Sequence, residues 1–256
     1  MLYSGLVSIT FRQLSTNDII ALCFQAGIDA IEWGGDIHVP HGDFARARQV
    51  RRITEEANLK IASYGSYYWA GHNDELEFEK VLQTAIELNA PVIRVWAGKK
   101  SPRDVEESYY NKVVDDSRRI SDLAQNKGVK ITFEFHRKTL TETNHSAKTF
   151  IETVSHNNVR INWQRPVGAD ESYCIEGLKS ILPWLSNVHV FYWGSDPNEP
   201  LFLQEGAESW INYINLIRST NRDHYLMIEF VKDNKPENFL RDAKTLSNWL
   251  KQLKYH

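Results

Sequence analysis

Short apolar runs alternate with longer segments of helical spacing along the whole chain. The runs are rich in Val, Ile, Phe, Tyr and Trp, which is typical of strands buried on both faces. There are eight runs, and each precedes a segment in which apolar residues recur every three or four positions. The predicted strands are Gly5–Thr10, Ala30–Trp33, Lys60–Tyr64, Val92–Trp96, Lys130–Phe135, Arg160–Trp163, Asn187–Tyr192 and Tyr225–Phe230.

The ends of the predicted helices carry local signals of their own. Ser15, followed three residues later by Asp18, predicts a capped helix start. Pro236 suits the first turn of the last helix, where its missing N–H leaves no bond unmade. Short joints that contain Gly or Asn, such as Ala26-Gly27-Ile28, separate helices from the next strand. The order of elements is therefore strand, helix, strand throughout.

This alternation predicts an α/β fold in which eight parallel strands close into a barrel. The chain has 256 residues, which is typical of one (β/α)8 or TIM barrel, so we expect a single domain over residues 1–256. The competing fold is an open, doubly wound sheet. It would normally carry a Gly-rich phosphate turn after an early strand. The first turn here is Thr10-Phe11-Arg12-Gln13, which has no glycine.

The net charge and the apolar runs of the chain indicate which kinds of partner are expected. The formal charge is −3, which disfavours nucleic acid and anionic membranes as partners because both need a basic face. No apolar run approaches a membrane span and no signal peptide begins the chain, so we expect a cytoplasmic protein. Cys23 and Cys174 are predicted to be small buried hydrophobes without a disulfide. The partners expected are a small-molecule substrate, with assembly into a homo-oligomer left open.

Three ionisable residues lie inside apolar strands near their carboxyl ends. Glu134, His189 and Glu229 are flanked by Phe, Val or Ile on both sides. A buried carboxylate costs several kcal/mol unless it is paired or metal-bound. Because the carboxyl ends of barrel strands converge, these residues predict a divalent metal site for Mn, Mg, Co or Zn. The alternative is that each glutamate pairs with an arginine, such as Arg94 or Arg137, and that His189 is a satisfied core residue.

Aromatic residues gather at the same ends of the strands. Five of the eight tryptophans fall there, and aromatic faces stack on the C–H faces of sugars. The alternative is that they only fill the barrel mouth, and that polar residues nearby are solvated. The predicted substrate contacts are His38, Trp69, Arg94, Trp96, His136, Trp193 and Lys232.

With these residues in view, the chain resembles the xylose isomerase-like TIM-barrel superfamily. This superfamily includes sugar and sugar-phosphate isomerases, ketose epimerases, inosose dehydratases and type IV AP endonucleases. The resemblance is strongest over residues 128–193, which contain Gly-Val-Lys-Ile-Thr-Phe-Glu134, Asn158-Val-Arg-Ile-Asn-Trp-Gln164 and Asn187-Val-His189-Val, and Met-Ile-Glu229-Phe closes the pattern. The AP endonuclease branch fits least, because the acidic balance opposes DNA binding.

The resemblance implies both a metal site and a reaction. The implied ligands are Glu134, the strand-six residue Gln164, His189 and Glu229, with Glu134 and Glu229 also serving as catalytic acid and base. The predicted function is a metal-dependent isomerase or epimerase that acts on a sugar or sugar phosphate. One glutamate would remove a proton next to a carbonyl, and the metal would stabilise the enediolate.

Three positions depart from the pattern of the superfamily. Gln164 stands where Asp is usual, Val167 where His is usual, and Ser195 where the ketose epimerases have Arg. A Gln amide oxygen can bind a hard cation but carries no charge, and His136 is a conceivable substitute ligand. Two further hypotheses therefore remain: a metal-dependent lyase or dehydratase on a polyol or keto sugar, and a non-catalytic carbohydrate-binding barrel.

Overall fold

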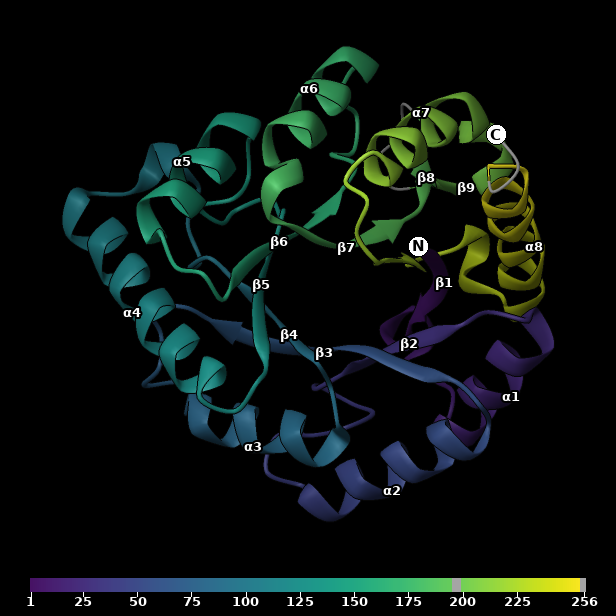
Figure 1. Ribbon diagram of the computed structural model, residues 1–256, viewed down its shortest axis with the longest axis horizontal. Coiled ribbons are helices and arrows are strands. Elements are labelled where there is room, and N and C mark those ends of the chain that lie inside the picture. Colours follow the sequence, from purple (N-terminus) through teal and green to yellow (C-terminus); the bar gives the residue numbers. More distant parts are fainter. Residues whose placement is uncertain (195–198, 254–256) are drawn as a thin grey trace.

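The computed structural model describes residues 1–194 and 199–253, in which eight parallel strands close into a barrel ringed by helices (Figure 1). The order of strands around the barrel is β1-β10-β7-β6-β5-β4-β3-β2. The predicted TIM barrel is confirmed. The strands are β1 (Leu2–Val7), β2 (Ala30–Gly34), β3 (Lys60–Trp69), β4 (Val92–Trp96), β5 (Lys130–Glu134), β6 (Val159–Gln164), β7 (Leu185–Val190) and β10 (His224–Ile228).

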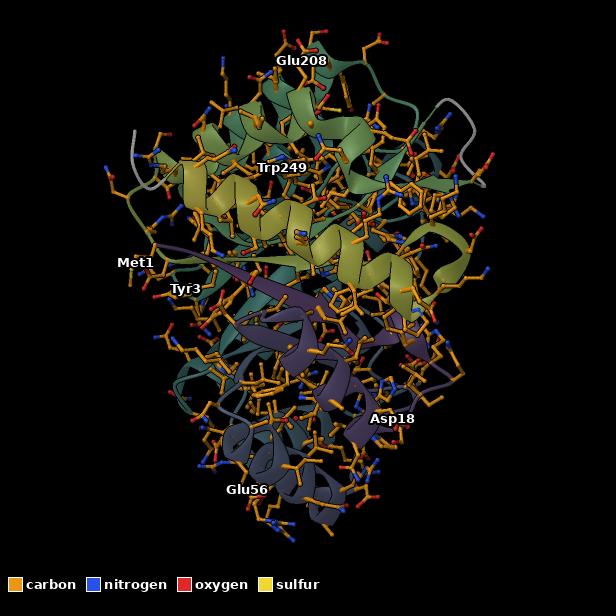
Figure 2. All side chains as sticks on the ribbon, turned by 90° about the vertical axis from the view of Figure 1, so that its right-hand side faces the viewer. Met1, Tyr3, Asp18, Glu56, Glu208 and Trp249 are labelled. Atoms are coloured by element: carbon orange, nitrogen blue, oxygen red, sulfur yellow. The ribbon has the colours of Figure 1, made fainter. Side chains whose placement is uncertain are left out.

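Helices follow the strands and bury one apolar face each. The Ser15–Asp18 capping box forms at the start of the first helix, and Pro236 begins the last. Figure 2 shows that last helix, with Trp249, lying across the outside of the barrel next to the amino-terminal strand. The helices are α1 (Thr16–Ala26), α2 (Phe44–Glu56), α3 (Phe78–Leu88), α4 (Glu107–Gln125), α5 (Asn144–Val154), α6 (Glu171–Ile181), α7 (Ala207–Arg218) and α8 (Pro236–Gln252).

Strand ends differ from the prediction at two places that shape the site. β1 stops at Val7, and Ser8–Phe11 forms a short 3-10 helix instead, in which the Ser8 hydroxyl accepts a hydrogen bond from the Gly34 backbone N–H. Strand β3 runs on to Trp69, and its register against β4 shifts between Gly65 and Trp69. This bulge re-aims the side chains that follow it.

The chain leaves the barrel after β7 sooner than predicted. Strand β7 ends at Val190, and the next two residues, Tyr192–Trp193, form β8, which pairs antiparallel with β9 (Pro200–Leu201). Ser195, one of the three departures from the superfamily pattern, lies outside the described residues. The short β8–β9 ribbon therefore begins directly beside the end of β7, which carries His189.

Buried apolar residues form two separate clusters. Val7, Ile9, Ala30, Ala62 and Met227 form a small apolar cluster that belongs to the first three strands, the turn after β1, and β10. The larger core lies between the strands and the helices and includes both cysteines, which are free and buried as predicted. No helix in the described ranges has the length and apolarity needed to cross a bilayer.

Candidate active site

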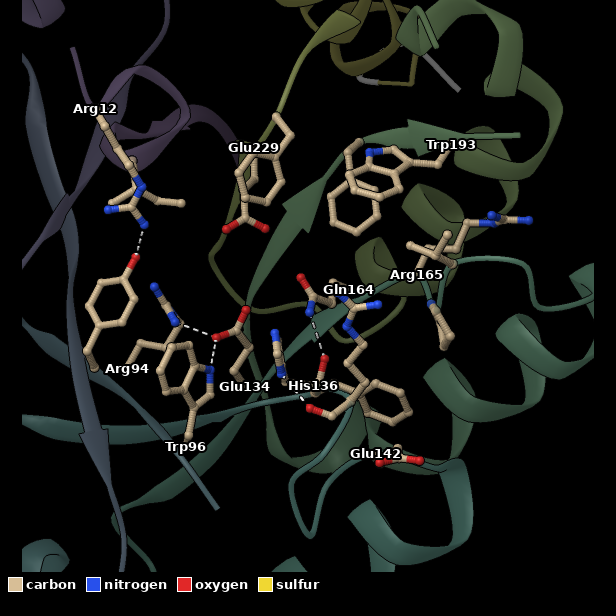
Figure 3. Close-up of a pocket in the computed structure, with 18 residues that line it drawn as sticks. Arg12, Arg94, Trp96, Glu134, His136, Glu142, Gln164, Arg165, Trp193 and Glu229 are labelled. Atoms are coloured by element: carbon tan, nitrogen blue, oxygen red, sulfur yellow. Dashed lines mark hydrogen bonds and ion pairs between the residues drawn. The ribbon is translucent and has the colours of Figure 1, made fainter. Parts of the chain in front are cut away.

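A cavity of about 400 Å³ opens at the carboxyl ends of the strands (Figure 3). Strands β3, β4, β5 and β6 each contribute lining side chains, and Glu229 follows β10 directly. This is the end of a TIM barrel at which active sites are built, because the loops after the strands can vary without disturbing the barrel. The polar lining includes Arg94, Glu134, His136, Gln164 and Glu229.

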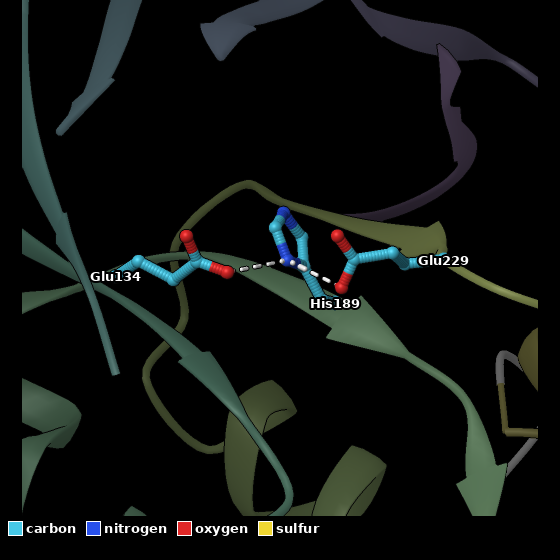
Figure 4. A group of neighbouring side chains, drawn as sticks. All are labelled: Glu134, His189 and Glu229. Carbon is cyan, nitrogen blue, oxygen red and sulfur yellow. Dashed lines mark ion pairs between the residues drawn. The ribbon is translucent and has the colours of Figure 1, made fainter. Parts of the chain in front are cut away.

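The three ionisable residues predicted to converge do meet at this end of the barrel. The Nδ1 atom of His189 lies 3.5 Å from Oε1 of Glu134 and 3.2 Å from Oε2 of Glu229. One ligand atom from each residue can be chosen so that all three lie within 4.8 Å of one another. Figure 4 shows the two carboxylates approaching the imidazole from opposite sides. All three residues are buried.

This arrangement fits a divalent cation. Among the described residues, neither ring nitrogen of His189 has a hydrogen-bond partner of good geometry, although the ring is fully buried. A buried imidazole nitrogen that lacks a hydrogen-bond partner and lies beside carboxylates is well placed to bind a metal ion. Gln164 donates its amide N–H to the Phe135 carbonyl, 2.9 Å away, so its amide oxygen is the atom that it would offer to a cation. The resulting set of oxygen and nitrogen donors suits Mn, Mg, Co or Zn.

A buried arginine distinguishes the two glutamates. Arg94 donates from Nε to Oε1 of Glu32 at 2.7 Å and from Nη1 to Oε2 of Glu134. The indole N–H of Trp96 donates to the same Glu134 oxygen. Within residues 1–194 and 199–253, Glu229 has no arginine or lysine partner. The alternative of an arginine pair is thus realised for Glu134, on one oxygen, and not for Glu229.

These contacts shift the ionisation of the buried groups. Burial alone would raise the pKa of Glu134, but Arg94 and then His189 outweigh it and hold the pKa well below its usual range. The same balance of burial against Arg94 and His189 lowers the pKa of Glu32 to about 2. Burial opposes charging of His189, but the carboxylates of Glu229 and Glu32 outweigh it and raise its pKa well above the usual value. Glu32 and Glu134 are therefore ionised at neutral pH.

Four of the seven predicted substrate contacts line the cavity. They are Arg94, Trp96, His136 and Trp193. The ring centroids of Trp96 and His136 lie 5.5 Å apart, and the indole nitrogen of Trp193 is buried without a partner among the described residues. Nδ1 of His136 lies 2.7 Å from the Arg137 carbonyl, so it carries the hydrogen in that bond.

The other three predicted contacts lie away from the cavity. Both nitrogens of His38 are engaged, by the Ser8 hydroxyl at 3.0 Å and the Leu14 carbonyl at 3.3 Å. The β3 bulge places Trp69 against Trp96, with ring centroids 4.1 Å apart, so it supports the wall and does not form it.

Lys232 is the third of these residues. Its Nζ stands 5.1 Å from the centre of the Phe202 ring, outside the cavity lining. All three residues lie at or after strand ends, as the sequence indicates, but their side chains do not line the cavity.

Two residues of the centre were missed. Glu32 lies within the apolar run Ala-Ile-Glu-Trp, which is the same signal that identified Glu134, and it could have been found from that signal. Tyr67 lines the cavity and accepts a hydrogen bond from Arg12 at 2.6 Å. Its φ of 56° lies in the left-handed region, a strain that the bulge imposes and that no sequence pattern announces.

Comparison with known proteins places the chain among enzymes of one fold. Residues 20–166 match the sequence profile of the family described as xylose isomerase-like TIM barrel. A 3-dehydroshikimate dehydratase of Bacillus anthracis is 26% identical over 282 residues, covering 97% of each chain.

Two solved structures share the fold at low identity. One is a xylose isomerase-like TIM-barrel protein from Mycobacterium smegmatis in complex with magnesium, with a TM-score of 0.74, 14% identity, and coverage of 98% of this chain and 97% of that one. The other is a D-psicose 3-epimerase in the presence of D-fructose, with a TM-score of 0.72, 16% identity, and coverage of 99% and 98%.

Proposed function

Because this chain belongs to the xylose isomerase-like TIM barrel family, we propose that it is a metal-dependent lyase that removes water from a small polyhydroxylated carbonyl compound. The observation that carries the proposal is the unequal environment of the two glutamates. Glu134 is held by Arg94 and Trp96, whereas Glu229 has His189 as its one ion-pair partner among the described residues. One free base is enough for elimination, while epimerisation through two glutamates needs both.

The metal ligands in this proposal are Oε1 of Glu134, Nδ1 of His189, Oε2 of Glu229 and the amide oxygen of Gln164. A divalent cation bound there would act as a Lewis acid on the substrate oxygen next to the proton that is removed. With Gln164 in place of Asp, the four ligands carry two formal negative charges instead of three. We therefore expect weaker metal binding than an Asp-containing site of the same geometry would give.

Glu229 is the proposed base, acting through Oε1, the oxygen that remains when Oε2 binds the cation. It removes the proton from the carbon next to the substrate carbonyl, and the C–H electron pair forms the new C=C bond as the bond to the β-hydroxyl breaks. Glu134 is unsuited to this step, because a carboxylate with a strongly lowered pKa is a weak base. Its depressed pKa instead suits a ligand that stays charged throughout.

His136 is the proposed proton donor to the leaving hydroxyl. Its Nδ1 is bound to the Arg137 carbonyl, and Figure 3 shows its other nitrogen directed toward Glu134 and Gln164. A protonated His136 can give that Nε2 hydrogen to the hydroxyl, which leaves as water, so atoms and charge balance. Around it, Trp193, Phe191 and Phe230 give the cavity an apolar wall for the face of a ring or an unsaturated product.

An isomerase or epimerase is the second candidate. What favours it is that the carboxylates of Glu134 and Glu229 flank one point from opposite sides, as an acid–base pair must. The relatives support both reactions, since one is named as a dehydratase and another as an epimerase. A barrel that only binds carbohydrate is the third candidate, and it predicts no turnover at all.

Product analysis of the metal-loaded protein separates these candidates. Cyclic and open-chain polyhydroxy ketones and keto acids, 3-dehydroshikimate among them, are incubated with enzyme in deuterated water. We expect a product that has lost one water and gained conjugated absorption. A product of unchanged composition that carries solvent deuterium would establish the epimerase and reject the lyase. Absence of both products and of deuterium uptake across the panel would favour the binding barrel.

The proposal includes a small-molecule partner and a cytoplasmic location. The two cysteines are free and buried, which suits a reducing compartment where no disulfide is needed.

A further inference from the structure

We propose that Glu32 is a positioning residue that fixes which nitrogen of His189 faces the metal. The inference rests on the proposed metal site, of which His189 is one ligand. Glu32 is buried at the end of β2 and does not line the cavity, so it touches neither substrate nor cation. Any effect it has on the centre must pass through the residues it contacts.

The geometry places the two nitrogens of His189 against different carboxylates. Nε2 lies 3.5 Å from Oε1 of Glu32, on the side away from the cavity. Nδ1 faces Glu134 and Glu229, which do line the cavity. The ring therefore stands between a structural carboxylate and two ligand carboxylates.

A neutral imidazole carries one hydrogen, and its position decides which nitrogen can bind a cation. A cation held between Glu134 and Glu229 would exclude the hydrogen from Nδ1, so the hydrogen would lie on Nε2, where the carboxylate of Glu32 can accept it. The lone pair of Nδ1 is then free to point between Glu134 and Glu229. Residues that orient a metal-binding histidine in this way typically change metal affinity 10- to 100-fold when they are removed.

Glu32 is itself held rigidly enough to orient a partner. Its Oε1 accepts from Nε of Arg94 at 2.7 Å, and its Oε2 accepts from the Ser63 hydroxyl. Gly65 makes room for the pair, because a Cβ at that position would lie 2.7 Å from Nη2 of Arg94 and 3.0 Å from Oε1 of Glu32. Arg94 also binds Glu134, so its guanidinium group fixes both Glu32, on the Nε2 side of His189, and Glu134, on the Nδ1 side.

A simpler role for Glu32 would be to neutralise Arg94 and nothing more. In that case, replacing Glu32 would lower the stability of the fold without moving the hydrogen on His189. The two roles differ in a spectroscopic property of the imidazole, so they can be separated without an activity assay.

The test compares the wild-type protein, Glu32→Gln and the control Glu75→Gln in zinc titrations followed by calorimetry and by ¹⁵N-edited histidine spectra. Glu75 pairs with Lys99 on the rim and is half exposed, so its replacement should leave the zinc dissociation constant unchanged. We expect Glu32→Gln to raise that constant about 10- to 100-fold. In the zinc-loaded wild type, His189 should carry its hydrogen on Nε2 alone, with the signal assigned through a His189→Gln variant.

Three results would overturn the proposal. One is a folded Glu32→Gln protein with a zinc dissociation constant within twofold of wild type. Another is a zinc-loaded wild type in which the hydrogen is on Nδ1, a result that stands even if Glu32→Gln fails to fold. The first result rejects the role of Glu32 alone, and the second also rejects Nδ1 as the ligand atom of His189. The third is a wild type that binds no zinc, which would reject the metal site as a whole.

Discussion

Glu134 and Glu229 lie on two sides of the barrel mouth and have different surroundings. On the side of β4 and β5, Glu134 receives hydrogen bonds from Arg94 and Trp96. On the side of β10, Glu229 has no such donors among the described residues and is followed by Phe230 in the cavity wall. Both glutamates are flanked by apolar residues at the carboxyl end of a strand, Glu134 as the last residue of β5 and Glu229 directly after β10. The local sequence of the two glutamates is alike, so their difference comes from the neighbouring strand. Donors from β4 hold the carboxylate of Glu134, and no strand supplies such donors to Glu229 among the described residues.

Replacing the free base should have the largest effect on turnover. We expect Glu229→Gln to lower kcat about 10³-fold, because a positioned base typically contributes 10²- to 10⁴-fold. Glu134→Gln, the matched change on the other side, should act mainly through metal affinity and be partly rescued by excess metal. Steady-state kinetics at saturating Mn²⁺ measures both. Rescue of Glu229→Gln by metal, with no rescue of Glu134→Gln, would reverse the assignment of the two glutamates.

Removing Arg94, whose charge distinguishes the two glutamates, should have the second largest effect, a loss of stability. Arg94→Met leaves Glu32 and Glu134 as buried carboxylates without their partner, and we expect a loss of about 3–5 kcal/mol in the free energy of unfolding. Urea denaturation measures the loss. Arg52→Met is the control, since Arg52 pairs with Glu56 on the exposed face of α2 and its loss should cost less than about 1 kcal/mol. Equal losses in the two variants would contradict the special role of Arg94.

A smaller change can push Arg94 and Glu32 apart without removing either side chain. Gly65→Ala inserts a methyl group against Arg94 Nη2 and Glu32 Oε1. We expect the free energy of unfolding to fall by about 1–3 kcal/mol, the cost of overpacking a filled site. Metal affinity should fall with it, because the pair behind His189 is displaced. A variant with unchanged thermal stability and unchanged Mn²⁺ affinity would show that the site is not tightly packed.

Asp242, far from the centre, extends the comparison to a buried carboxylate held by one backbone donor. It accepts from the Leu203 N–H at 2.9 Å, and burial raises its pKa to about 6. The folded state therefore binds this proton more tightly than the unfolded state does, so its contribution to stability is greatest below about pH 4 and is lost as pH rises to about 6. We expect Asp242→Asn to stabilise the protein by about 1–2 kcal/mol at pH 7 and not at pH 4. Thermal melts at the two pH values measure this, and destabilisation at pH 7 would contradict it.

The sequence predicts the barrel and the convergence of Glu134, His189 and Glu229, because parallel strands bring their carboxyl ends together regardless of detail. It does not predict which carboxylate Arg94 binds. That choice depends on the register between β2, β3 and β4, where the pairing shifts after Ile31 and again after Gly65. The same shifts turn Trp69 behind Trp96 and bring Tyr67 to the cavity. Four positions on β3, from Gly65 to Trp69, span two positions on β4, and a hydrophobic pattern does not reveal such a shift.

Binding of Mn²⁺ to the metal-stripped protein tests the shared centre most directly. Equilibrium titration should show one ion per chain, and His189→Gln should weaken that binding at least tenfold while the fold is retained. The absence of saturable binding in the wild type, or equal affinity in folded His189→Gln, would contradict a metal held between Glu134 and Glu229.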